Sequence, residues 1–212
     1  MRTGIYIVLV FLIFPLTGFA SGWEYYVEPK VIVSLNKSNG FCLNLKEETR
    51  FKNGKNYYDK TFVGLSKKLK KDIEFSLYGA VVEIKKKDRW DVSYLLWPEL
   101  ACKHRLSKYE LNSNSKLECF IIENRWNFRE QLSIAFPIND KISFWLGDEP
   151  RLLSLFDKTY FGENEALAGI SCNLIIKTIS SSLNIFYDLR SIKQNGNWEN
   201  TNCIRNVLNF TF

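Results

Sequence analysis

The stretch IEFSLYGAVVEI, at residues 73–84, indicates the fold most clearly because its side chains alternate in character. In an extended chain one face would carry Ile73, Phe75, Leu77 and Val81. The opposite face would carry Glu74, Ser76 and Tyr78. A period of two is typical of a β-strand with one buried face. The sequence therefore predicts a strand here, with its apolar face in a protein core.

The next stretch repeats this period, with Trp90, Val92, Tyr94 and Leu96 at alternate positions. The link between the two stretches, residues 85–89, is short and charged, which predicts an antiparallel pair. Trp97-Pro98 is expected to end the second strand, because proline has no N–H to donate to a strand ladder.

Similar stretches recur through the chain at residues 31–35, 41–45, 117–123, 132–138, 142–146, 174–178, 183–189 and 203–212. Polar turns separate several of them, at residues 53–54, 139–141 and 195–196. This pattern predicts a mainly β fold, an antiparallel β-sandwich or small barrel, in one domain spanning residues 21–212. One region differs: Leu152, Leu153, Leu155 and Phe156 have a helix-like spacing. We expect a short helical excursion near residues 150–165.

Residues 1–20 have the layout of a secretory signal peptide. Arg2 precedes an apolar run at residues 5–14, and small residues follow around Gly18 and Ala20. The run is about ten residues, whereas a membrane-spanning helix needs about 20. We expect cleavage after Ala20 and export to the periplasm, the cell surface or the medium. An uncleaved anchor is the alternative.

Five cysteines are expected to meet an oxidising environment after export. We predict disulfides Cys102–Cys119 and Cys172–Cys203, with residues 112–115 as a turn inside the first loop. Cys42 is then left over. No C-x-x-C pair occurs and His104 is the single histidine, so neither a metal site nor a cofactor is expected.

The chain carries a formal charge of +6, which is compatible with an anionic partner. Two lysine clumps stand out: Lys67, Lys68, Lys70 and Lys71, then Lys85, Lys86 and Lys87. If both clumps fell at one end of a sheet, they would form a joint anion-binding patch. Solvated loops that discourage strand pairing are the alternative. Trp126 and Trp198 lie among polar residues and are candidate surface anchors, either for stacking on a glycan or for an interface. A protein partner or an anionic surface ligand is expected. Nucleic acid is not expected.

Catalysis has little support in the sequence. His104 is the single candidate base for a serine triad, but the sequence has no G-x-S-x-G motif and no other recognisable nucleophile motif. Paired carboxylates for a secreted glycosidase-like hydrolase could come from Asp148, Glu149, Glu163 and Glu165. A solvated acidic loop is the alternative, and we favour a protein that is not an enzyme.

The terminal stretch places Ile204, Leu208, Phe210 and Phe212 on one side, and Asn206 breaks the series. It resembles the closing strand of chaperone-usher fimbrial subunits, which implies strand exchange with a protein partner. It also resembles the last strand of outer-membrane barrels. An ordinary edge or core strand is the third possibility.

We favour an exported, disulfide-containing binding or assembly protein, possibly accessory to a bacterial surface or fimbrial system. A small outer-membrane barrel is an alternative. Membrane contact follows only from that barrel or from a retained leader.

Overall fold

A computed structural model describes residues 23–212 except 37–39, 88, 177–178 and 195, and the predicted signal peptide lies outside this part. The described residues form eleven strands and no helix. No helix long and apolar enough to cross a membrane is present in this part of the chain. The strands are β1 (Glu24–Asn36), β2 (Phe41–Lys52), β3 (Lys55–Lys70), β4 (Ile73–Lys86), β5 (Arg89–Leu106), β6 (Tyr109–Phe120), β7 (Arg125–Pro137), β8 (Ile142–Leu155), β9 (Tyr160–Ile176), β10 (Ile179–Gln194) and β11 (Asn197–Thr211).

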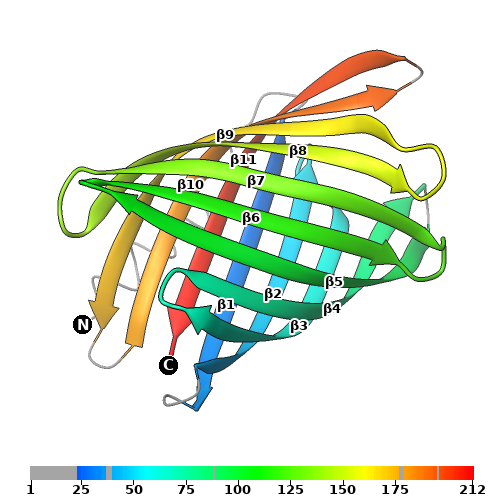
Figure 1. The fold of residues 1–212 in the computed structure, drawn as a ribbon. Helices are drawn as coiled ribbons and strands as arrows, with labels where there is room; N and C mark the ends of the chain where they lie inside the picture. Colours follow the sequence, from blue (N-terminus) through cyan, green and yellow to red (C-terminus); the bar gives the residue numbers. More distant parts are fainter. Residues whose placement is uncertain (1–22, 37–39, 88, 177–178, 195) are drawn as a thin grey trace.

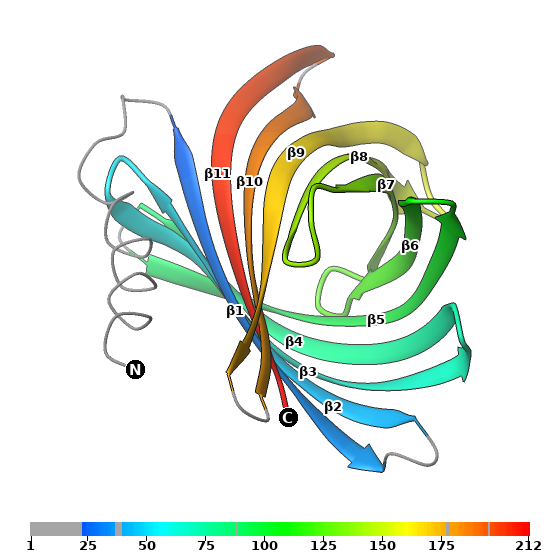
Figure 2. The ribbon, with the colours of Figure 1, turned by 90° about the vertical axis from the view of Figure 1, so that its left-hand side faces the viewer.

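The strands form a closed barrel (Figures 1 and 2). Each strand pairs antiparallel with its sequence neighbours, and β1 closes the ring by pairing parallel to β11, with Glu24 opposite Cys203. Rim I is the end that holds the β2–β3, β4–β5, β6–β7, β8–β9 and β10–β11 connections. Rim II is the opposite end, which holds the other connections and the end of β11. The mainly β prediction is confirmed, and of its two forms the barrel is the one observed.

The expected helical excursion near residues 150–165 is wrong. β8 continues to Leu155, a short turn follows, and β9 begins at Tyr160. The register of β8 with β9 shifts between Arg151 and Leu152, and both Ser154 and Phe156 have positive φ. These local irregularities interrupt the strand alternation, which is why the leucine spacing imitated a helix.

The hairpin predicted from residues 73–96 is confirmed as β4 and β5, but β5 does not end at Trp97-Pro98. It continues to Leu106, and its register with β6 passes directly from Leu96 to Glu99. Proline is accommodated because the β5–β6 ladder is interrupted at that point.

The turns are confirmed at some positions and not at others. Asn53 and Gly54 both have positive φ, as a tight hairpin turn requires, and residues 139–141 connect β7 to β8. Residues 112–115 are not a turn, because they lie inside β6. Their polar character has another cause: Asn112 and Asn114 face the polar interior of the barrel, whereas Ser113 bonds Glu130 on the outside.

The faces of the wall are reversed relative to the prediction from β4. Phe75 and Leu77 are 42% and 54% exposed, whereas Ser76 and Tyr78 are buried. The apolar face therefore forms the outside of the barrel. Inside, β3, β4 and β5 contribute the packed cluster of Phe62, Tyr78, Ala80, Val82, Leu95 and Trp97. The remaining interior is mostly polar and contains the candidate site.

Candidate functional site

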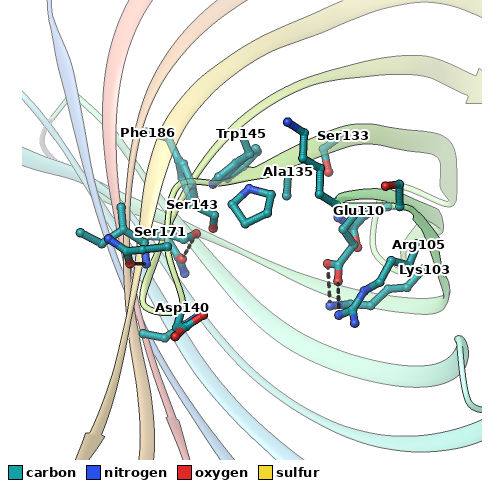
Figure 3. Close-up of a pocket in the computed structure, with 18 of the residues that line it drawn as sticks. Lys103, Arg105, Glu110, Ser133, Ala135, Asp140, Ser143, Trp145, Ser171 and Phe186 are labelled. Atoms are coloured by element: carbon teal, nitrogen blue, oxygen red, sulfur yellow. Dashed lines mark hydrogen bonds and ion pairs between the residues drawn. The ribbon is translucent and has the colours of Figure 1, made fainter.

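The lumen is divided into two adjoining spaces. A vestibule of about 840 Å³ opens at rim II, where its lining includes Lys108 and Asp140 from the β5–β6 and β7–β8 connections. Figure 3 shows the side chains that line it, Asp140 among them. A chamber of about 540 Å³ occupies the barrel interior. Gln131, Trp145 and Phe186 line both spaces. The Trp145 and Phe186 rings are in contact, with centroids 4.1 Å apart, so this aromatic pair lies at the boundary.

The vestibule has polar walls. Glu110 accepts a hydrogen bond from Lys103 at 3.1 Å and lies 4.0 Å from Arg105, as Figure 3 shows. On the opposite wall the Ser171 hydroxyl donates to Asn184 at 2.5 Å. These side chains engage one another, so the vestibule resembles a hydrated entrance more than a binding site.

One wall of the chamber, formed by β6 to β11, carries a continuous chain of ion pairs. Arg151 is at its centre: its Nη2 lies 2.7 Å from both Glu149 and Glu165, and its Nη1 lies 2.9 Å from Glu163. In the β8–β9 register Glu149 lies directly opposite Glu165. Two buried carboxylates so placed would repel each other, and the shared guanidinium offsets that repulsion.

Three more arginines extend the ion-pair chain in both directions. Arg129 bonds Glu149 and lies 2.8 Å from Glu118. Arg190 and Arg205 continue it on the other side, through Glu163 at 2.5 Å and through Glu165 at 3.0 Å. Arg205 also lies 2.9 Å from Asp188, which completes the chain. Because each acid has a cationic partner, this wall is a network of ion pairs rather than a set of free catalytic groups.

The facing part of the chamber, from β3, β4 and β5, is aromatic. The Tyr78 and Trp97 rings stack with centroids 5.0 Å apart, and Phe62 meets Trp97 edge-on at 5.4 Å. Lys60 lies over this cluster, its Nζ 4.4 Å from the Trp97 centroid. The chamber thus combines a flat apolar surface with charge.

The predicted lysine patch does not form. Lys68, Lys70 and Lys71 lie at the β3–β4 connection on rim II, whereas Lys86 and Lys87 lie at the β4–β5 connection on rim I. The full length of β4 separates the two clumps, because successive connections of an antiparallel sheet alternate between its ends. Lys86 lies 2.9 Å from Asp91, so at least one of these cations is paired.

The predicted tryptophan anchors both lie at rim I. Trp198 is 43% exposed and contacts Phe161 at 5.4 Å, and Trp126 is half-buried and contacts Phe156 at 6.1 Å. They belong to β11 and β7, which are not neighbours in the barrel. They do not form one binding surface.

The four predicted carboxylates are separated by the barrel wall. Asp148 is exposed on the outside, where Asn164 donates to it at 2.8 Å. Glu149, Glu163 and Glu165 face the chamber and take part in the ion-pair chain. The sequence reasoning missed their arginine partners. A signal was present: charges recur two residues apart, as in Glu48–Arg50, Glu149–Arg151 and Asp188–Arg190, so each pair shares one face of a strand.

The predicted disulfides are absent from the structure, and all five cysteines are free thiols. Cys102 lies opposite Ser113, whereas Cys119 lies opposite Leu96, six positions away along β5. At about 3.3 Å per residue the two positions are about 20 Å apart. Cys172 shares the outer face with Ile170, whereas Cys203 is buried inside. The error follows from the assumed turn at residues 112–115, which would have brought the first pair together.

In the described part of the chain no cluster of three or more His, Cys, Asp or Glu side chains is arranged to hold a metal ion. Comparison of the sequence with protein-family models and with curated proteins gives no match. Function must therefore be inferred from the barrel itself.

Proposed function

We propose that the protein is a transmembrane β-barrel of the outer-membrane type, which encloses a polar chamber within a bilayer. The observation that carries this proposal is the polarity of its wall. A water-soluble barrel hides apolar side chains and exposes polar ones, but here the order is reversed. Outward apolar residues occur around the ring, among them Leu45, Val63, Leu77, Leu96, Leu132, Leu146 and Ile170.

Aromatic side chains at both rims support the same proposal. At rim I the outer face carries Trp90, Trp126, Phe161 and Trp198. At rim II it carries Phe41, Tyr109, Phe136 and Phe144. Aromatic girdles of this kind mark the two bilayer interfaces of membrane barrels. We call the outer face between them the apolar band.

The strands are long enough for this role. They run from 12 residues in β2 to 18 in β5. A tilted membrane-spanning strand needs about 9–11 residues, so each strand is long enough to cross a bilayer. The lysine clumps then lie at the two membrane surfaces, where long cationic side chains reach water or lipid headgroups.

Two features depart from bacterial outer-membrane barrels. Those barrels have an even number of strands, whereas eleven are described here and the closing pair is parallel. The apolar band also contains acids such as Glu130. Its carboxylate accepts hydrogen bonds from Ser113 at 2.7 Å and Ser115 at 2.5 Å, which lowers the cost of placing a carboxylate there.

An accessory role in a fimbrial system stays a hypothesis. Fimbrial subunits receive a partner's strand at an open sheet edge. In this barrel β1 and β11 pair with each other, so the described strands offer no such edge. A hydrolase role has less support, because the lumen carboxylates are ion-paired with arginine.

Fractionation and flotation test the proposal. The protein, refolded in detergent and mixed with phosphatidylcholine vesicles, should float with them on a density gradient and resist extraction by alkaline carbonate. Its folded form should also run differently from the heated form on SDS gels. A monodisperse monomer in detergent-free buffer, left at the bottom of the gradient, would contradict the proposal, because the apolar band could not be exposed to water.

A further inference from the structure

Lys60 is a buried cation that lacks an acidic partner. It is 6% exposed, on the lumen side of β3. Its Nζ lies 4.4 Å from the Trp97 ring centroid and 5.2 Å from that of Phe62. Neighbouring acids are already engaged: Arg50 holds Glu48 at 2.5 Å, and Arg129 holds Glu118 at 2.8 Å. Among the described residues Lys60 takes part in no ion pair, and ring contacts alone compensate poorly for a desolvated ammonium group.

The rest of the chamber shares this excess of positive charge. Its described lining includes ten basic and six acidic side chains, and Glu165 and Asp188, which pair with Arg205 of that lining, bring the acids to eight. Arg205, in the same lining, has a buried Nε with no hydrogen-bond acceptor. Buried acceptors without a donor also occur there, such as Asn114 Oδ1, so the buried ammonium group of Lys60, rather than the balance of donors and acceptors, is the reason to expect an anion.

The aromatic wall narrows the class of anion. Lys60 lies against the stacked rings of Tyr78 and Trp97, so an anion bound to its ammonium group would place its remaining atoms near these rings. A flat apolar body would pack on them, whereas an inorganic ion would leave them uncovered. The volume of about 540 Å³ falls within the range of about 300–1,000 Å³ that is usual for small-molecule pockets.

We propose that the chamber binds a small organic anion with a flat apolar body, such as an aromatic carboxylate, and that Lys60 is its ionic partner. Entry is from rim II, through the vestibule and past the Trp145–Phe186 pair. This inference goes beyond the membrane proposal. It concerns what the lumen holds, and the lumen is the same whatever surrounds the barrel.

Equilibrium dialysis of the folded protein against benzoate tests the proposal, with empty micelles as the blank. The wild-type protein should bind benzoate at least about tenfold more tightly than benzyl alcohol, its neutral analogue, and more tightly than inorganic phosphate. Lys60→Met should weaken benzoate binding by about tenfold or more and leave benzyl alcohol unchanged. Lys60→Arg should restore most of the affinity. Lys108→Met is the matched control, because Lys108 also lies over an aromatic ring, that of Tyr109 at 5.3 Å, but at the vestibule mouth.

The inference would be overturned by no benzoate binding by the wild-type protein, by equal affinity for benzoate and benzyl alcohol, or by unchanged affinity in folded Lys60→Met. The first two results need no variant, so the proposal can be tested even if Lys60→Met does not fold. Tighter binding of phosphate than of benzoate would also contradict it, because the aromatic wall would then play no part. If the protein proves soluble without detergent, the same dialysis in plain buffer tests the chamber separately from the membrane proposal.

Discussion

On β4, Phe75 and Leu77 face away from the barrel, whereas Ser76 and Tyr78 face the lumen and are buried. The same contrast recurs on β8, where Leu146 is exposed and its near neighbours Glu149 and Arg151 are buried. The inward face is packed and ion-paired within the chain itself. The outward face has no protein partner in the described residues, and in the proposed membrane lipid would cover it. Substitutions on the two faces should therefore destabilise the protein for different reasons.

The largest effect is expected in the ion-pair chain. Arg151→Ala removes the shared partner of Glu149, Glu163 and Glu165. It should lower the free energy of unfolding by about 3–5 kcal/mol, because three buried carboxylates each lose one of their cationic partners. Urea unfolding of the protein in micelles, followed by tryptophan fluorescence, measures the loss. Arg89→Ala is the control, since Arg89 is 81% exposed at rim I, and it should change stability by less than about 0.5 kcal/mol. Equal effects for the two would mean that the chain is not structural.

A charge on the apolar band should have the next largest effect. Leu146→Arg places a guanidinium on the outer face of β8 and should cost about 2–4 kcal/mol in vesicles, whereas Ile138→Arg, at the rim II turn, should cost about 0–1 kcal/mol. Unfolding in phosphatidylcholine vesicles gives both values. If Leu146→Arg were neutral there, the outer face would not contact lipid.

A third pair compares crowding on the two faces. At Gly169 an added Cβ would meet Phe186 Cδ1 at 2.3 Å and the Ile185 carbonyl oxygen at 2.5 Å, and the backbone oxygen cannot move aside easily. Gly169→Ala should therefore cost about 1–3 kcal/mol. At Gly79, which faces outward, a Cβ would meet just Leu96 at 3.4 Å. Gly79→Ala should be close to neutral. If urea unfolding showed a larger loss of stability for Gly79→Ala than for Gly169→Ala, the lumen side would be less tightly packed than the outer face.

The smallest effect is expected at rim I, outside the apolar band. A hydrogen bond from Lys86, together with Arg89, lowers the pKa of the Asp91 carboxyl below its ordinary value. A group with a lowered folded pKa contributes stability above its unfolded pKa, near about 4. That contribution is lost as the pH falls through the folded pKa. Asp91→Asn should remove this slight acid dependence and change little at pH 7. A steeper pH profile in the variant than in the wild-type protein would contradict the assignment.

The strand periodicity gave the β class, the β4–β5 hairpin and the turn at Asn53 and Gly54. It did not give the direction of the faces, because alternation is symmetric: Phe75 outward and Phe75 inward produce the same pattern. The terminal strand was informative, since Ile204, Asn206 and Leu208 do share a face. The ion-pair chain was missed because Arg151 and Glu163 meet through strand register, which no local spacing encodes. The polar residues 112–115 inside β6 resemble a turn for a different reason, since a strand that faces a polar lumen has the composition of a loop.

The parallel seam between β1 and β11 has a consequence for the order of assembly. Every other strand pair can form as a hairpin soon after its two strands are made, but the seam joins Glu24 to Cys203, 179 positions apart. Contacts so distant in the chain form slowly, because a long loop must close before any pairing compensates for it. Pairing of β1 with β11, which closes the barrel, should therefore be the last step and should occur cooperatively. A nascent chain shorter than about 200 residues would remain an open, curled sheet.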